Sequence, residues 1–312
     1  MSAPFVGLDV GGTFLKAALV SEEGEVRARL HQPTARDSAE ALLSQLASAT
    51  AQLEAGSGKA AGVGVGLPGI VNRRTGKLYR PPNLPAIDGI DAAGELSRRT
   101  GRPAVAENDA NAAALAEAWK GAGRDAVNVL LVTLGTGIGG GIVLGGRIWE
   151  GTSGYAGEVG HVLVDPGGVR CGCGSWGCVE TYAGAPGWAR RARQALERAP
   201  QSRLHGLALD PASIVEAARG GDEVALGVVE ETAAALGAAI GGALNVLNLD
   251  RVVLAGGVAA AGEFLLDRVV EQTRRRVFPH VFADCSFRLA ELGGDAGVVG
   301  AARAAMIALA LA

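Results

Sequence analysis

Apolar stretches of β type recur along this chain, and several of them end in a glycine-rich turn. Four do so: Phe5–Val10 before Gly11 and Gly12, Val63–Leu67 before Pro68 and Gly69, Val127–Leu134 before the run 135–141, and Arg251–Ala255 before Gly256 and Gly257. A glycine turn after a strand lets backbone N–H groups come close to a phosphate, because no Cβ intervenes. The pattern therefore predicts four strands with candidate phosphate-binding turns at their ends.

Helical periodicity fills the intervals between these strands. The predicted helices are Ser38–Glu54, Ala92–Thr100, Asn111–Lys120, Pro186–Ala199, Pro211–Arg219, Asp222–Leu247, Gly262–Arg276 and Gly297–Leu311. Ser38 is a suitable N-cap for the first of them, because its hydroxyl can accept a free backbone N–H. A last strand is expected near Phe287–Leu289. Alternating strands and helices predict an α/β fold with mixed sheets.

Two of the strand–turn units resemble one another. The first runs from Val6 through Gly-Gly-Thr13 into an apolar stretch, and the second runs from Val129 through Gly-Thr-Gly137 into another. Each predicts a β-hairpin that turns on glycine and threonine. Their separation predicts two related domains that face a common nucleotide. We expect a small N-terminal α/β domain at 1–118 and a larger C-terminal α/β domain at 119–297, with a final helix at about 298–312 packed on the first.

Charge and composition narrow the class of protein. The chain has 312 residues, 48% of them hydrophobic and 20% charged, with a net charge of -3. The absence of a basic block argues against a nucleic-acid partner, because phosphate contacts need clustered Lys and Arg. The start of the chain lacks a signal-peptide pattern, so we expect a cytoplasmic protein. The uncharged stretch Thr232–Leu249 is mostly Ala and Gly, and this predicts a buried helix and no membrane partner.

Three of the four cysteines fall within eight residues of one another. Cys171, Cys173 and Cys178 follow His161 closely, and three thiolates with one imidazole make a tetrahedral zinc set. Such crowding without an export signal favours metal binding over two disulfides. Four protein ligands leave no position for water, so the predicted Zn²⁺ is structural. Cys285 stands alone and is read as a small buried hydrophobe.

The first hairpin turn is a candidate site for the phosphates of a nucleotide. The backbone amides of Gly11 and Gly12 and the hydroxyl of Thr13 can donate to phosphate oxygens, and Asp9 can hold Mg²⁺ through water. Lys16 either reaches a phosphate or is a solvated strand residue. A plain glycine hairpin is the alternative for the turn, but the Asp before it and the second copy downstream favour phosphate.

Two later glycine runs are further candidates for nucleotide contact. The run 135–141, which includes Thr136 and Gly137, lacks the Lys-Ser/Thr ending of a P-loop, and strand follows where a dinucleotide motif needs a helix. Gly256 and Gly257 open a predicted helix. They either pass close to the adenosine part of a nucleotide or serve only the geometry of a strand-to-helix turn.

The candidate catalytic residue is Asp109, within Glu107-Asn-Asp-Ala-Asn111. Its position at the start of a predicted helix allows a purely structural interpretation as the N-cap. The chemical interpretation is a general base, because phosphoryl transfer to an alcohol needs a carboxylate that accepts the hydroxyl proton. The nearby phosphate candidates favour the second interpretation.

Together these motifs resemble the ROK family of sugar kinases and repressors. The matching pieces are Asp9-Val-Gly-Gly-Thr13, Gly66-Leu-Pro-Gly-Ile-Val-Asn72, Glu107-Asn-Asp-Ala-Asn-Ala112, Leu134-Gly-Thr-Gly-Ile-Gly-Gly-Gly141, Gly157-Glu-Val-Gly-His161 and Cys171-Gly-Cys-Gly-Ser-Trp-Gly-Cys-Val-Glu180. The resemblance implies a two-lobed fold like those of actin, hexokinase and Hsp70, with a structural zinc loop. It also implies ATP and Mg²⁺ as cofactors and a homodimer or higher homo-oligomer.

The resemblance further assigns roles to individual residues. It implies Asp109 as the base for the 6-hydroxyl of a hexose. The residues that it implies for binding the sugar are Gly69, Asn83, Asn108, Asp109, Glu158, His161 and Glu180. His161 would then use one ring nitrogen for zinc and the other for the sugar, as a metal-bound imidazole needs a second partner.

The predicted activity is ATP-dependent phosphorylation of glucose. The alternatives are N-acetylmannosamine or another hexose such as fructose or allose as acceptor, polyphosphate as donor, and a sugar-responsive transcription regulator as function. The side chain of Ile70 cannot donate to an N-acetyl group, which favours glucose. A regulator needs a DNA-binding helix-turn-helix, for which the strand beginning at Phe5 leaves no room.

Overall fold

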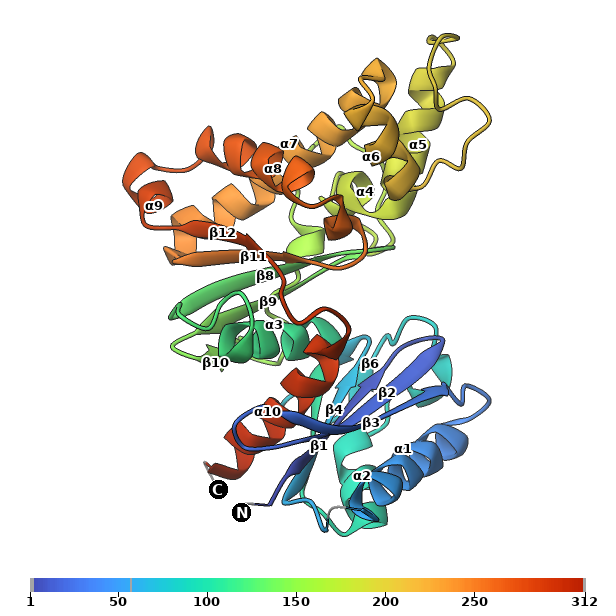
Figure 1. The fold of residues 1–312 in the computed structure, drawn as a ribbon, viewed down its shortest axis with the longest axis vertical. Helices are drawn as coiled ribbons and strands as arrows, with labels where there is room; N and C mark the ends of the chain where they lie inside the picture. Colours follow the sequence, from blue (N-terminus) through green and yellow to red (C-terminus); the bar gives the residue numbers. More distant parts are fainter. Residues whose placement is uncertain (1–2, 57, 311–312) are drawn as a thin grey trace. The chain divides into compact units, whose positions relative to one another are not determined.

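A computed structural model describes residues 3–56 and 58–310 of the chain (Figure 1). The chain divides into two compact units. The first consists of Met1–Asp125, Gly141–Gly157 and Glu291–Ala312, and the second of Ala126–Gly140 and Glu158–Ala290. Each unit has its own share of the candidate site residues.

The first unit is built on a five-stranded sheet in the order β3-β2-β1-β4-β7. The strands are β1 Phe5–Val10, β2 Phe14–Val20, β3 Val26–Pro33, β4 Gly62–Leu67 and β7 Ala104–Asn108. β1 and β2 form the predicted antiparallel hairpin, and β4 and β7 extend the sheet in parallel. A small second sheet pairs β5 Ile70–Val71 with β6 Leu78–Tyr79. The turn after β1 and the end of β7 both carry candidate site residues.

Helices cover both faces of this sheet. Helices α1 Ala39–Glu54 and α2 Ala92–Thr100 pack together, and α1 contacts β1, β2 and β3. Helices α3 Asp109–Lys120 and α10 Ala296–Ala310 also pack together, and α10 lies along β1 and β4 (Figure 1). Short 3-10 turns at Pro85–Ile87 and Gly293–Asp295 complete the unit. The turn Gly293–Asp295, directly before α10, lies beside the hairpin that contains Asp9.

Two strand glycines allow the close approach of α10. A Cβ added to Gly7 would lie 1.9 Å from the carbonyl oxygen of Val298, and one added to Gly64 would lie 1.7 Å from that of Ala301. Both neighbours are helix backbone, so no side-chain rotation relieves the clash. These positions require glycine for packing, independently of backbone dihedral angles.

We expect Gly64→Ala to destabilise the protein by about 2–3 kcal/mol, because inserting a methyl group into a packed interface forces the helix away. The measurement is the free energy of unfolding in urea. Gly227→Ala is the matched control, since Gly227 lies within helix α7 and an added Cβ would meet no atom within 4 Å apart from the nearby backbone of its own helix. The control should gain about 0.5–1 kcal/mol from helix propensity. Equal stabilities of the two variants would contradict the packing argument.

The other five-stranded sheet has the order β10-β9-β8-β11-β12. Its strands are β8 Asn128–Leu134, β9 Ile138–Leu144, β10 Arg147–Ile148, β11 Arg251–Ala255 and β12 Ser286–Leu289. β8, β11 and β12 run parallel, while β10 pairs antiparallel with β9. The helices of the second unit are α4 Glu180–Ala183, α5 Ala185–Leu196, α6 Pro211–Arg219, α7 Glu223–Leu247, α8 Glu263–Arg274 and α9 Pro279–Ala283, with 3-10 turns at Val159–His161 and Val258–Ala261.

Helix α7 contains most of the uncharged stretch Thr232–Leu249 noted in the sequence, preceded by a first part that carries three glutamates. Both α7 and the segment Gly293–Ala310 are long and apolar enough to cross a membrane, by length and composition only. In their most apolar windows, 61% and 44% of the residues are buried within the protein. Helix α7 packs against α5, α6 and α8, as expected for the core helix of a unit.

The predicted elements agree closely with those observed. Ser38 caps α1 as predicted, accepting the N–H of Ala41 at 3.1 Å. Helix α3 begins at Asp109, two residues before the predicted start. The predicted last helix is observed to Ala310, and its predicted residues 311 and 312 lie outside the described part of the chain.

Candidate functional site

The corner between β7 and α3 presents the candidate base. Asn108, not Asp109, is the N-cap of α3: its Oδ1 accepts the N–H groups of Ala110 and Asn111 at 2.9 and 3.1 Å. The interpretation of Asp109 as the cap is therefore wrong, because the preceding amide side chain takes that position. Asp109 is the first residue of the helix, and its side chain is exposed. The carboxyl group is free of the capping role and accessible to a substrate.

The electrostatic surroundings of Asp109 suit a base. The surrounding protein desolvates the carboxyl group and raises its pKa to about 6, while hydrogen bonding from the backbone N–H of Ala110 opposes the rise. The negative charge of Asp9 adds to the increase. Asp109 is exposed, yet enough protein surrounds its carboxyl group to desolvate it. A base whose pKa lies slightly below neutrality is ionised at pH 7 and still basic enough to accept a proton.

The other candidates of the first unit lie on the hairpin and the nearby loops. Asn83 faces the first turn: a Cβ added to Gly12 would lie 3.1 Å from the Cβ of Asn83. The side-chain amide of Asn108 donates to the carbonyl oxygen of Gly69 at 2.8 Å. Burial raises the pKa of Asp9, and the charge of Lys16 opposes this. The structure thus links the proposed sugar residues Gly69 and Asn108 directly.

Some nucleotide candidates of the first unit have structural partners. The N–H of Gly11 closes the hairpin by donating to the carbonyl oxygen of Phe14 at 2.9 Å, so this amide is occupied. The ammonium group of Lys16 donates to the carbonyl oxygen of Gly294 at 3.3 Å. Gly12 and Thr13 lie between them in the turn, and Thr13 is exposed. The turn therefore offers fewer free donors to a phosphate than its sequence suggests.

In the second unit, Glu180 connects the zinc loop to the turn between β8 and β9. Its Oε2 accepts the N–H of Ile138 at 3.1 Å, and a Cβ added to Gly137 would lie 2.5 Å from the same oxygen. This places Thr136 and Gly137 beside Glu180. Gly256, whose φ is +91°, lies against the backbone of Leu134 at the end of β8, with Gly257 following. Glycine is required at position 256 by this conformation and this contact.

The predicted metal ligands converge within the second unit. The ligand atoms of His161, Cys171, Cys173 and Cys178 all lie within 4.8 Å of one another. Nδ1 of His161 is 3.6 Å from the Cys171 sulfur, and the Cys173 and Cys178 sulfurs are 3.7 Å apart. Zinc–sulfur bonds of about 2.3 Å at tetrahedral angles place ligand atoms roughly 3.8 Å apart. The four residues therefore fit a tetrahedral ion.

The same cluster leaves one imidazole nitrogen available. Since Nδ1 of His161 faces Cys171, Nε2 is free to face away, and it lies 3.8 Å from a carboxylate oxygen of Glu158. Burial raises the pKa of the Cys171 thiol to about 12, so this group needs a cation to become a thiolate at neutral pH. Zinc binding would supply that cation and release the proton.

The predicted site residues therefore form two groups. The first unit holds Asp9, Gly11, Gly12, Thr13, Lys16, Gly69, Asn83, Asn108 and Asp109, and the second holds Thr136, Gly137, Glu158, His161, Cys171, Cys173, Cys178, Glu180, Gly256 and Gly257. Two further polar residues, Glu107 and its ion-pair partner Arg73, were not predicted as site residues. Glu107 is the last residue but one of the apolar strand β7 and directly precedes Asn108, which is the signal that could have identified it.

The chain belongs to the ROK family, whose pattern matches residues 5–307. It is 41% identical to a glucokinase of Halalkalibacterium halodurans over 95% of this chain and 93% of that protein. It is 34% identical to an N-acetylmannosamine kinase of Escherichia fergusonii over 95% of this chain and 96% of that protein. These relatives identify the class of activity as that of a sugar kinase.

Solved structures agree with this assignment. A ROK hexokinase from Thermus thermophilus superposes with a TM-score of 0.89 at 34% identity, covering 99% of this chain and 100% of that one. A ROK glucokinase from Streptomyces griseus, solved with glucose and AMPPNP, gives 0.80 at 34% identity over 97% and 99%. The predicted actin/hexokinase-like α/β fold is confirmed, and the protein is a sugar kinase.

Proposed function

We propose that this kinase transfers the γ-phosphoryl group of ATP to the 6-hydroxyl of glucose, with Asp109 as the general base. The observation that carries the proposal is the Asp109 carboxyl group, which is exposed at the start of α3 and has its pKa raised to about 6. The relative solved with glucose and AMPPNP supports both the acceptor and the nucleotide.

The residues divide the chemistry between them. Asp109 orients the hydroxyl and accepts its proton as the phosphorus–oxygen bond forms. Asp9 would hold Mg²⁺ through water, and this ion would neutralise charge on the phosphates when bound. Gly12 and Thr13 of the first turn, with Thr136 and Gly137 of the second, would donate to phosphate oxygens. Gly256 and Gly257 would lie along the adenosine.

The remaining sugar hydroxyls are assigned to polar groups of both units. Asn83 and Asn108 would bind them from the first unit, and Glu158, His161 and Glu180 from the second. We propose a structural Zn²⁺ on His161 Nδ1 and the three cysteines, which leaves Nε2 for the sugar. The proposal places the enzyme in the cytoplasm as a homodimer or higher homo-oligomer.

A coupled ADP-release assay over a sugar panel tests the proposed acceptor. Glucose is expected to give the highest kcat/KM, at least about tenfold above N-acetylmannosamine, because Ile70 offers no side-chain donor to an amide and a missing polar contact costs roughly 1–3 kcal/mol. Fructose and allose are included as further acceptors, and polyphosphate as an alternative donor. A panel in which an N-acetylated sugar leads would reassign the acceptor while retaining the kinase.

A further inference from the structure

A buried ion pair lies directly behind the candidate base. Glu107, at the end of β7, is only 3% exposed, and its carboxylate pairs with the guanidinium of Arg73 from the turn after β5. Arg73 also donates to the carbonyl oxygen of Ala106 at 3.0 Å. Arg73 therefore binds both Ala106 and Glu107, the two residues of β7 directly before Asn108.

Glu107 also holds the start of α3 by hydrogen bonds. Its Oε1 accepts the backbone N–H of Asn108 at 2.9 Å and the side-chain amide of Asn111 at 3.1 Å. The carboxylate of Glu107 therefore restrains both the N-cap and the first turn of α3. Asp109 lies between the two donors in the chain, so its backbone position follows from theirs.

Arg73 also holds a second segment. Its guanidinium pairs with Glu150 at 2.9 Å, and its backbone N–H donates to the carbonyl oxygen of Ser153 at 3.1 Å. Gly154 approaches the sheet so closely that an added Cβ would lie 2.2 Å from the carbonyl oxygen of Val71. This segment ends at Gly157, and Glu158 follows it in the chain.

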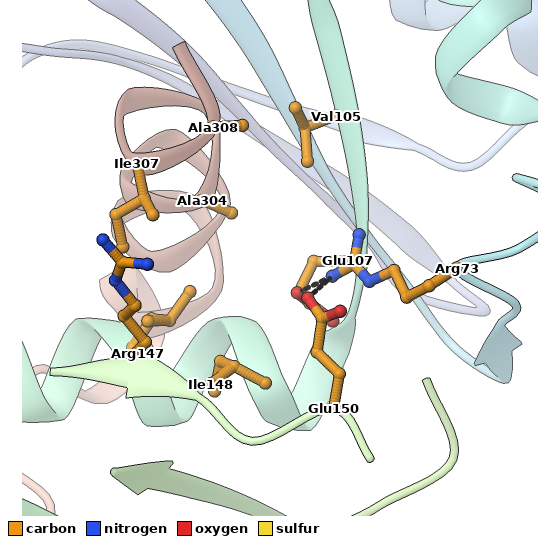
Figure 2. A pocket seen from close by; sticks show the side chains of 10 residues that line it. Arg73, Val105, Glu107, Arg147, Ile148, Glu150, Ala304, Ile307 and Ala308 are labelled. Carbon is orange, nitrogen blue, oxygen red and sulfur yellow. Dashed lines mark hydrogen bonds and ion pairs between the residues drawn. The ribbon is translucent and has the colours of Figure 1, made fainter. Parts of the chain in front are cut away.

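The side chain of Arg73 is accessible to solvent. Its side chain is 26% exposed and lines a pocket of about 250 Å³ (Figure 2). Arg73, Glu107 and Glu150 form one side of this pocket, and Ala304, Ile307 and Ala308 of α10 lie across from them. Removal of the arginine side chain would leave a space continuous with the pocket.

We infer that Arg73 is a positioning residue for phosphoryl transfer: through Glu107 it sets the place of Asp109, and through Glu150 and Ser153 it anchors the segment that leads to Glu158. It touches neither sugar nor nucleotide in this role. The inference rests on Asp109 and Glu158 acting as proposed, but it holds for any hexose that the wild-type enzyme phosphorylates.

The test compares Arg73→Ala with Arg74→Ala in steady-state kinetics. Arg74 is the next residue in the same turn, but its side chain is exposed. Arg73→Ala is expected to lower kcat per folded molecule about 10- to 100-fold and to raise the KM for hexose several-fold, because small misplacements of reacting groups have effects of this size. The KM for ATP should stay within about twofold of wild type. Arg74→Ala should match wild type in all three parameters.

Chemical rescue separates positioning from a general loss of structure. A guanidinium ion can enter the space left in Arg73→Ala and lie between Glu107 and Glu150. Millimolar guanidinium is expected to restore kcat at least about fivefold in a saturable manner, whereas urea at the same concentration should not. Rescue by both compounds or by neither overturns the inference.

The kinetic outcomes are equally decisive. If Arg73→Ala matches Arg74→Ala, or loses activity only in proportion to folded protein with an unchanged hexose KM, Arg73 does not position the site. If Arg73→Ala does not fold, Glu150→Gln carries the test, and an unchanged hexose KM in that variant overturns the inference. Inactive wild-type protein would instead refute the proposed function.

Discussion

Replacing Asp109 by Asn is expected to lower kcat for hexose phosphorylation by about 10²–10⁴-fold, the usual contribution of a general base. Folding should be almost unaffected, because Asn108 supplies the helix cap. The raised pKa of Asp109 means that its ionised form is less favourable in the folded protein than in the unfolded chain. A neutral amide removes that cost. The measurements are kcat by ADP release and thermal unfolding at pH 7.

The matched control is Asp37→Asn, which makes the same chemical change at an exposed position of the first unit. It should retain kcat within about twofold, as surface substitutions usually do. The wild-type pH profile gives a second readout: kcat/KM should fall about tenfold per pH unit below the Asp109 pKa of about 6, because the protonated carboxyl group cannot accept a proton. An Asp109→Asn enzyme with more than about a tenth of the wild-type kcat would rule out this base.

Loss of one of the proposed zinc ligands is expected to cause the second large decrease in activity. Cys173→Ser should abolish stoichiometric zinc binding and reduce kcat/KM by at least about 10²-fold, because the proposed ion would order the loop that presents His161 and Glu180. Cys173 is chosen because it is less buried than Cys171 and Cys178, so the substitution disturbs packing least. Zinc content by mass spectrometry and activity in the same preparation are the measurements.

Cys285→Ser is the control for this prediction. Cys285 is the one cysteine outside the cluster, and burial raises its pKa to about 12, so it is neither a ligand nor a reactive thiolate. The variant should keep its zinc and its activity. Fully active wild-type protein without bound metal, or a zinc-loaded Cys173→Ser enzyme, would refute the assignment of the cluster.

Most of the longer helices and strands were predictable because local signals agreed with tertiary packing, whereas β3 Val26–Pro33 and α9 Pro279–Ala283 were not predicted. The predicted strand Phe5–Val10 and helix Ala92–Thr100 are observed with the same bounds. The predicted convergence of four metal ligands also follows from sequence, since three closely spaced cysteines shortly after a histidine are typical of a zinc site. In these places residue type and spacing alone determine the outcome.

Other features needed coordinates. Asn and Asp are equally good N-caps, so propensity could not decide between Asn108 and Asp109. Nothing in the sequence distinguishes Arg73 from Arg74, yet the first is paired with a buried carboxylate and the second is exposed. Such differences depend on which way a turn faces, and this is fixed by contacts with residues distant in the chain.

The close packing of α10 against Gly7 of β1 and Gly64 of β4 has a consequence for biosynthesis. Strands β1 and β4 leave the ribosome well before α10, the helix that covers them. Until α10 has been made, one side of the first sheet lacks its native cover, and such exposed apolar surface favours aggregation. The first unit therefore cannot be completed before α10 has been made, and nascent chains stalled before Ala296 should be clients for chaperones.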